Sequence, residues 1–444
     1  MSDLRRVFEA HENSLFSRLA HNHLFAGLLL IGSTALALWL ANSAHAEWYF
    51  NFRHTPVSIN VGAFAMQKSL EHWVNDALMS FFFFYIGLEI KKEVIDGELS
   101  SLRRAALSVV AAIGGMAAPA AIYFLLTRNH PEVQGGWGIP IATDIAFAIG
   151  ILSLLGRTVP LSLRVFLTAL AIVDDLGSIL VIAIFYSEGV VLSYIGLSIL
   201  FVVAARAYTR LSGTAYGDRD WVILALGSAS WYFMFKSGIH ATISGVIMAL
   251  AIPLRERLRP NAVQEYISGD GFRLEDNLSA TEHAVRLARS PLRRIIHALH
   301  APVVMFIMPF FAFMNAGVVL PDSFAKALHA PHMLGIELGL VVGKMLGITL
   351  ACWIAVRLRI ADLPRGANWT DMAGVGLLAG IGFTMSLFVA GLSFEGRAAL
   401  LDDAKLAILF ASFTAAIAGS AVILLNRNRR PALPEDPAPP RGGH

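Results

Sequence analysis

Long apolar stretches separated by short polar ones dominate the pattern of this chain. Each stretch is close to the roughly 20 residues that a helix needs to cross a bilayer. The pattern therefore predicts an all-α polytopic membrane protein with 12 transmembrane helices. The apolar runs lie at residues 23–42, 72–92, 103–126, 138–155, 159–186, 189–206, 220–236, 239–254, 296–319, 333–356, 370–394 and 404–426.

The polar stretches between and around these runs set the predicted domain organisation. Leu4, Val7 and Phe8 begin an amphipathic pattern that places the N-terminal segment on the membrane surface. Alternation of apolar and polar residues from Trp48 to Val61 indicates an external β-hairpin. We expect a cytoplasmic amphipathic N-terminus (1–22), a twelve-helix domain (23–427) with an external hairpin or loop (43–71) and a charged cytoplasmic loop (255–295), and a disordered cytoplasmic tail rich in Pro and Gly (428–444).

Composition supports the membrane assignment. Hydrophobic residues make up 56% of the chain and charged residues 15%, whereas a soluble protein carries about 25% charge. The pI near 9.0 raises the question of a nucleic-acid partner. However, 27 of the 35 Lys and Arg residues fall on one side of the predicted topology and 7 on the other, with Lys344 inside a run. This asymmetry predicts that both termini are cytoplasmic and that no nucleic acid is bound.

Four ionisable residues lie where lipid is expected. Asp174 and Asp175 fall about 15 residues into their run, which is roughly 20 Å along a helix and near mid-membrane. Asp144 and Lys344 reach a similar depth in other runs. A lone aspartate can serve helix packing, but four such residues carry a summed insertion cost on the order of 10 kcal/mol. We therefore expect a functional site.

Two runs carry helix-breaking residues at mid-span. Pro140 precedes Thr143 and Asp144 within about one turn, and Gly380 and Gly382 precede Thr384. Unwound backbone is tolerated at that depth only where protein buries it or where it lines a wet cavity. Two interrupted helices at corresponding positions indicate a transporter binding site. Runs 3–5 and 10–12 are then predicted to be inverted repeats. Each repeat contains three helices, and because this number is odd the second copy is inserted in the opposite orientation in the membrane.

The residue types suit a monovalent cation. Carboxylates, the Thr143 hydroxyl and freed carbonyl groups supply the oxygen ligands that replace its water. A desolvated carboxylate also holds a proton tightly, and it binds either the proton or the cation. That exclusion predicts a cation/proton exchanger, with no cofactor and no enzymatic activity. Alternatives on the same fold are a sodium-coupled solute symporter and an uncoupled cation channel or sensor.

Several motifs together resemble the NhaA-type sodium/proton antiporters, from about His23 to Arg427. The matching stretches are Asn75-Asp76-Ala77-Leu78-Met79, Gly87-Leu88-Glu89-Ile90-Lys91-Lys92-Glu93, Ala142-Thr143-Asp144-Ile145-Ala146-Phe147, Val173-Asp174-Asp175-Leu176-Gly177, Lys236-Ser237-Gly238-Ile239-His240-Ala241-Thr242, Asn315-Ala316-Gly317-Val318, Gly343-Lys344-Met345-Leu346-Gly347 and Gly380-Ile381-Gly382-Phe383-Thr384-Met385-Ser386. The resemblance implies a pH-regulated, electrogenic exchanger of Na⁺ or Li⁺ for protons in the bacterial inner membrane.

The resemblance also implies roles for the ionisable residues. Asp175 is expected to be the main Na⁺ or Li⁺ carboxylate. Its neighbour Asp174 is expected to pair with Lys344 in one state. Thr143 and Asp144 are expected at the crossing of the broken helices. There Asp144 offsets the positive ends of the half-helices and Lys344 offsets the negative ends.

Two further features rest on the resemblance. Glu89, Glu93, His297 and His300 match positions linked to pH sensing, and histidine titrates near pH 6.5 when unperturbed. Ile296 departs from the family pattern, which has glutamate there, so a different pH threshold is expected. The external hairpin is expected to pair two subunits into a homodimer surrounded by membrane lipid.

Overall fold

The computed structural model describes residues 23–61, 64–187, 189–211, 220–254, 290–321 and 330–427. The predicted N-terminal segment (1–22), the predicted tail (428–444) and residues 255–289 of the predicted cytoplasmic loop lie outside these ranges. The last residues of that loop are wrongly assigned, because helix α15 already begins at Pro291. Ser290 accepts a hydrogen bond from the Arg293 amide and so provides the N-cap.

Every predicted apolar run contains helix, which confirms the all-α prediction. Within the described ranges, seven helices or continuous helical segments are long and apolar enough to cross a membrane, and three bent helix pairs raise the number to ten. The shorter α11 and α12 occupy the two remaining runs. The helices are α3 (His23–Ala41), α4 (Ala46–His54), α5 (Leu70–Trp73), α6 (Met79–Asp96), α7 (Leu102–Thr127), α8 (Ile145–Leu154), α9 (Leu161–Phe185), α10 (Leu192–Leu211), α11 (Asp220–Lys236), α12 (Ile243–Ala251), α15 (Pro291–Pro302), α16 (Met308–Asn315), α18 (Pro331–Leu338), α19 (Lys344–Arg357), α20 (Trp369–Ala379), α21 (Phe383–Ser393) and α22 (Ala398–Leu425), with 3₁₀ turns η2 (Glu98–Ser100), η3 (Pro131–Ile141) and η4 (Gly156–Thr158).

Three of the spans in the described part of the chain contain a π-helical turn. These turns are η1 (Val74–Leu78), η6 (Val303–Ile307) and η7 (Gly339–Gly343). The π-turn η7 ends immediately before Lys344, the lysine predicted at the site. Such turns insert an extra residue into the helical ladder and often occur at functional positions. The sequence pattern did not predict them: η6 and η7 contain only apolar residues and glycine, and the polar Asn75 and Asp76 of η1 do not mark a π-turn.

The helices fall into two compact units. Unit 1 contains the chain up to Ser100 and the stretch Ile179–Val319, and unit 2 contains Ser101–Ser178 and the chain from Leu320 onward. Unit 2 therefore contains the two predicted repeats, one from each half of the chain, except for the end of run 5 (179–186), which belongs to unit 1. Each half of unit 2 contributes one interrupted span, η3 with α8 and α20 with α21. Helix α9 contributes to both units.

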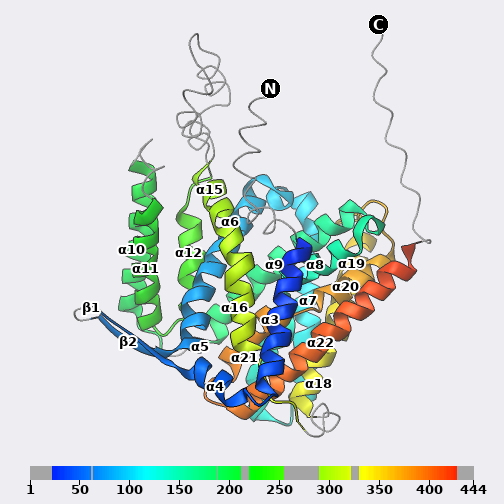
Figure 1. The fold of residues 1–444 in the computed structure, drawn as a ribbon. Helices are drawn as coiled ribbons and strands as arrows, with labels where there is room; N and C mark the ends of the chain where they lie inside the picture. The colour runs from blue at the N-terminus through cyan, green and yellow to red at the C-terminus, as the bar shows by residue number, and fades with distance from the viewer. Residues whose placement is uncertain are drawn as a thin grey trace, which may run out of the picture. The chain divides into compact units, whose positions relative to one another are not determined.

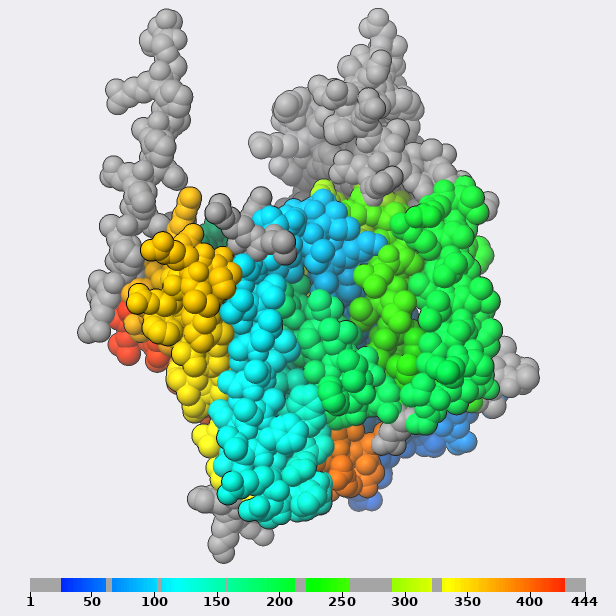
Figure 2. Space-filling view, turned by 180° about the vertical axis from the view of Figure 1, so that it is seen from behind, coloured from blue at the N-terminus to red at the C-terminus, as the bar shows by residue number. Residues whose placement is uncertain are grey.

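Close contact between α7 and α19 joins the two halves of unit 2, and Figure 2 shows the yellow α19 lying along the cyan α7. A Cβ atom added to Gly347 would lie 2.2 Å from the Gly114 carbonyl oxygen, and one added to Gly114 would lie 2.4 Å from that of Gly347. Small residues let membrane helices approach backbone to backbone in this way. The contact lies one turn after Lys344, so it fixes the position of that residue against α7.

Unit 1 contains α10 and α11 side by side (Figure 1) and the predicted hairpin. The hairpin strands are β1 (Pro56–Val61) and β2 (Phe64–Ser69), paired antiparallel from Pro56 with Ser69 to Val61 with Phe64. The prediction that pairing strands begin at Trp48 is wrong, since Ala46–His54 forms α4. Trp48 and Phe52, four residues apart, stack with ring centroids 5.6 Å apart, which is a helical spacing.

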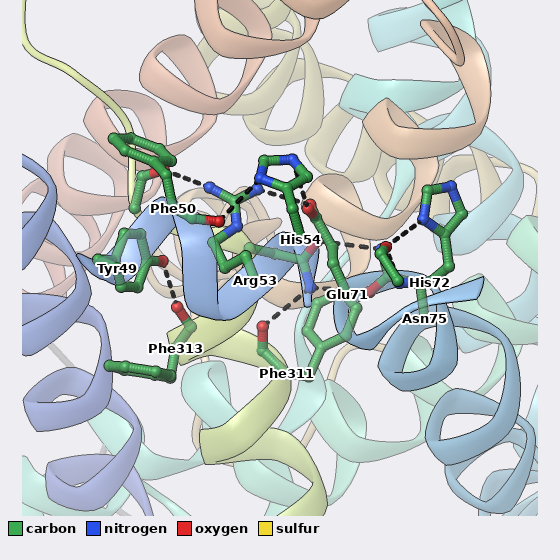
Figure 3. Close-up of polar contacts among 12 residues, drawn as sticks. Tyr49, Phe50, Arg53, His54, Glu71, His72, Asn75, Phe311 and Phe313 are labelled. Atoms are coloured by element: carbon green, nitrogen blue, oxygen red, sulfur yellow. Dashed lines mark hydrogen bonds and ion pairs between the residues drawn. The ribbon is translucent and has the colours of Figure 1, made fainter. Parts of the chain in front are cut away.

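A buried polar cluster joins the two elements that flank the hairpin (Figure 3). Arg53 of α4, only 5% exposed, binds Glu71 of α5 with an Nη2–Oε1 distance of 2.6 Å. Its Nη1 donates to the Gly317 carbonyl at 3.1 Å, just beyond the end of α16. The Tyr49 hydroxyl donates to the Phe313 carbonyl at 2.5 Å. The cluster therefore anchors the base of the hairpin and places a cation at the negative end of α16.

Candidate functional site

The two interrupted spans meet at their breaks within unit 2. The helices bend by 47° between η3 and α8 and by 48° between α20 and α21. The Asp144 amide donates to the Ile381 carbonyl at 2.7 Å, and the Thr143 hydroxyl donates to the Ala379 carbonyl at 2.7 Å. Backbone groups that the breaks leave unpaired are thus satisfied across the crossing, as burial requires.

Asp144 caps the N-termini of two half-helices. Its Oδ1 accepts from the Phe147 amide at 3.0 Å, in the first turn of α8. Its Oδ2 accepts from the amide and the hydroxyl of Thr384, at 3.2 and 2.5 Å, in the first turn of α21. A carboxylate is stabilised at a helix N-terminus by the partial positive charge there, and here one carboxylate serves two such ends.

The two predicted helix-breaking glycines lie where neighbouring atoms come too close to leave room for a side chain. A Cβ atom added to Gly380 would lie 2.1 Å from the Leu340 carbonyl oxygen, so no larger residue fits without a shift. Gly382 is restricted in the same way by the Leu340 side chain and by Ser386. Gly380 and Gly382 have φ values of −73° and −86°, which any residue adopts. Pro140 lies in η3, just before the break at Ala142.

Asp174 and Asp175 lie near the middle of α9 with 1% and 2% of their surface exposed. Lys344, 1% exposed, donates from Nζ to Asp174 Oδ2 at 2.6 Å. The other oxygen of Asp174 and the Oδ1 atom of Asp175 are buried and have no hydrogen-bond partner among the described residues. The lysine thus neutralises one carboxylate and leaves the neighbouring carboxylate without a bonded counter-ion among the described residues.

The hydrogen bonds of the described residues join the predicted site residues in two groups. Thr143, Asp144 and Thr384 share the crossing, whereas Asp174 and Lys344 form an ion pair. Lys344 donates its hydrogen bond to Asp174 and not to the carbonyl end of a half-helix, where it was expected to offset the negative charge. No group of three or more His, Cys, Asp or Glu side chains among the described residues is placed to hold a metal ion.

Two serines at the crossing were missed as site residues. Ser386 donates to the Ile139 carbonyl at 2.9 Å, and Ser412 of α22 accepts from the Phe383 amide at 3.1 Å. Ser386 ends the motif that begins at Gly380, so its position next to the break could have identified it as a residue of the crossing. Ser412 lies in a plain apolar run, and nothing in the sequence marks its role.

The predicted pH-sensing residues belong to unit 1 and are only partly brought together. The Tyr85 hydroxyl lies 3.3 Å from Glu89 Oε1 and 3.0 Å from His300 Nδ1, and so it bridges α6 and α15. Glu93 instead accepts a hydrogen bond from the Glu98 amide at 3.1 Å, at the start of η2. His297 is exposed on α15. Tyr85 was not predicted, although its position four residues before Glu89 places both on one face of a helix.

Comparison with known proteins adds to this geometry. A sequence model of the family described as Na⁺/H⁺ antiporter 1 matches residues 17–423. The chain belongs to the Na⁺/H⁺ antiporter 1 family. This confirms the resemblance based on the motifs, and all the residues of the crossing and of the Asp174–Lys344 pair lie inside the matched range.

Individual members of the family are similar over most of their length. A Mesorhizobium japonicum protein named Na(+)/H(+) antiporter NhaA is 44% identical over 412 residues, covering 93% of this chain and 95% of that protein. One of the same name from Oleidesulfovibrio alaskensis is 45% identical over 423 residues, with 91% and 93% covered. Another from Salmonella paratyphi A is 43% identical over 395 residues, with 88% and 93% covered.

Proposed function

We propose that this protein is an electrogenic antiporter that extrudes Na⁺ or Li⁺ in exchange for protons across the bacterial inner membrane. The observation that carries the proposal is Asp175, a carboxylate that is 2% exposed and lies beside a second carboxylate. One of its oxygens is buried with no hydrogen-bond partner within the described ranges. A buried carboxylate needs either a proton or a cation. Membership of a family whose relatives are named Na(+)/H(+) antiporters supports the same reading.

The Asp174–Lys344 pair gives the exchange its charge imbalance. A cation that binds between the two carboxylates draws Asp174 away from Lys344, whose ammonium then lies buried without its counter-ion and releases a proton. Asp175 releases the second proton directly. Two protons then exchange for one cation, so each cycle moves one net charge. The membrane potential supplies about 2.3 kcal/mol per 100 mV for that charge.

Asp144 and Thr143 hold the crossing in place while the cation comes and goes. Asp144 accepts three hydrogen bonds and compensates two helix ends, so we assign it a fixed charge in place of a transported proton. The pH dependence is assigned to Glu89, Glu93, His297 and His300 of unit 1. The hairpin β1–β2 is proposed to pair two copies of the chain. The asymmetry of Lys and Arg supports the proposal that both termini are cytoplasmic.

The test uses purified protein in liposomes with an acidic interior and an entrapped pH-sensitive dye. Adding Na⁺ or Li⁺ outside should raise the internal pH, because protons leave as cations enter. Asp175→Asn should abolish this exchange, since the amide cannot bind a proton and binds cations poorly. Asp362→Asn, which changes an exposed aspartate of unit 2, is the control and should retain it.

A second arm of the same experiment tests the charge imbalance. An inside-positive diffusion potential should speed proton exit, because each cycle carries net positive charge outward. An unchanged rate would exclude an electrogenic exchange. Cation entry with no proton movement would exclude the antiporter and favour an uncoupled channel.

A further inference from the structure

Three oxygen atoms lie buried within five residues of α9 and have no hydrogen-bond partner in the part of the chain that the structure describes. They are Oδ1 of Asp174, Oδ1 of Asp175 and Oγ of Ser178. The three residues are 1%, 2% and 1% exposed. Buried polar atoms are nearly always paired, so each exception requires an explanation. The two carboxylates already belong to the proposed site, whereas Ser178 has been given no role.

The hydroxyl of Ser178 is unlike other hydroxyls of the same chain. A serine or threonine in a helix commonly donates to the carbonyl one turn earlier. Thr168 of α9 does so to Arg164 at 3.0 Å, and Ser187, just after α9, does so to Ala183 at 2.9 Å. Ser178 makes no such bond within the described part of the chain. Its hydroxyl is therefore free to bind something else.

The spacing along α9 places Ser178 beside both carboxylates. It follows Asp175 by three residues and Asp174 by four. Residues three and four apart are neighbours on a helix surface, with Cβ atoms about 5–6 Å apart. The helix is uninterrupted from Leu161 to Phe185, so this relation holds throughout. Three unpaired oxygens consequently share one face of one helix.

We propose that the Ser178 hydroxyl is a ligand of the transported cation, together with the Asp174 and Asp175 carboxylates. This inference rests on the proposed antiport function and extends it to a residue outside the acids. Hard cations bind through oxygen, and a hydroxyl adds a ligand without adding charge. An oxygen in this role needs to be free of a permanent hydrogen bond, and the Ser178 hydroxyl meets that condition among the described residues.

The test compares three substitutions at this position. Ser178→Ala removes the ligand, and Ser178→Cys replaces it with a thiol of similar size that binds hard cations poorly. Both should raise the KM for Na⁺ about tenfold, with the rate at saturating Na⁺ retained. Ser178→Thr keeps the hydroxyl and should stay close to the wild type. Ser198→Ala is the control, because it deletes a fully buried hydroxyl that is already bonded to Ser230.

Equilibrium binding of radioactive Na⁺ to the detergent-solubilised protein at alkaline pH gives a second readout independent of transport. The Kd should rise with the KM in the Ala and Cys variants. Unchanged Na⁺ affinity in a folded Ser178→Ala protein would overturn the role of Ser178, as would an equal loss in Ser178→Thr. A wild-type protein that binds Na⁺ without moving protons would instead overturn the antiport function and leave the ligand assignment standing.

Discussion

The Tyr85 hydroxyl can link the protonation of a histidine to a glutamate on another helix. This hydroxyl carries a single proton and lies between Glu89 Oε1 and His300 Nδ1. When His300 is protonated, its Nδ1 donates to the Tyr85 oxygen, and the tyrosine proton is free for Glu89. When His300 is neutral with the proton on Nε2, both partners compete for that single proton. The protonation state of His300 in α15 thus changes the hydrogen bond that Glu89 in α6 receives.

Tyr85→Phe should shift the pH dependence of antiport toward lower pH. The hydrogen bond that the charged imidazole makes is the stronger one, so its loss destabilises the protonated state more than the neutral state. The midpoint of the activity–pH profile should move by up to about one pH unit, which corresponds to about 1.4 kcal/mol. Tyr194→Phe, in α10, is the matched control and should leave the midpoint in place. A midpoint that does not move in Tyr85→Phe would remove the bridge from pH sensing.

Side-chain contacts between helices were the feature that the sequence predicted least well. Charged residues at membrane depth were visible, because their insertion cost sets them apart from apolar neighbours. The bond between Phe383 and Ser412 joins different helices, and the bridge from Tyr85 to His300 spans 215 residues. Neither contact leaves a periodic signal. Which carboxylate Lys344 would bind was implied by the family resemblance and not by the residues themselves.

At the scale of the elements, the interrupted helices were predictable and the ends of elements were not. Pro140 and Gly380 mark the two breaks in sequence, and both breaks are found. The hairpin was placed too early, since the aromatic residues of α4 alternate with polar ones over a few positions and imitate a strand. The π-turns left no signal, because η6 and η7 lie in runs that stay apolar and the polar residues of η1 do not mark an added residue.

Gly380→Ala should disrupt the crossing of the broken helices. The added methyl group would lie 2.1 Å from the Leu340 carbonyl oxygen, which cannot give way without moving η7. We expect a loss of roughly 1–3 kcal/mol or more of stability, with loss of antiport. Gly391→Ala, within α21, is the control: its methyl group meets nothing within 4 Å and should stabilise the helix by about 0.5–1 kcal/mol. Apparent melting temperatures in detergent would measure both, and a Gly380→Ala protein as stable as Gly391→Ala would contradict this.

For the whole molecule, the pattern of apolar runs predicted which stretches group together. Runs 3–5 and 10–12, proposed as repeats, supply the two halves of unit 2, and the remaining runs together with the end of run 5 supply unit 1. The predicted cation site lies in unit 2 and the predicted pH-sensing residues in unit 1. The orientation of the chain in the membrane still rests on the charge asymmetry of the loops.

Labelling of single cysteines tests that orientation. The one native cysteine, Cys352, is buried and should not react. Ser58→Cys in β1 should react with a membrane-impermeant thiol reagent in intact cells, and Ser100→Cys in η2 should react only in inside-out vesicles. Both serines are exposed, so the two introduced cysteines should be equally accessible to a reagent that reaches their side of the membrane. The opposite pattern would reverse the topology.

The bond between Asp144 and Thr384 also has a consequence for biosynthesis. The two residues are 240 positions apart, and at about 5–20 residues per second the ribosome takes roughly 10–50 s to pass from one to the other. During that interval Asp144 is in the membrane with the partner in α8 but without the partners in α21. The nascent chain must therefore shield a carboxylate near mid-membrane until the second repeat arrives. The crossing that stabilises the finished transporter makes its assembly a late step, which begins only when the final spans have been inserted.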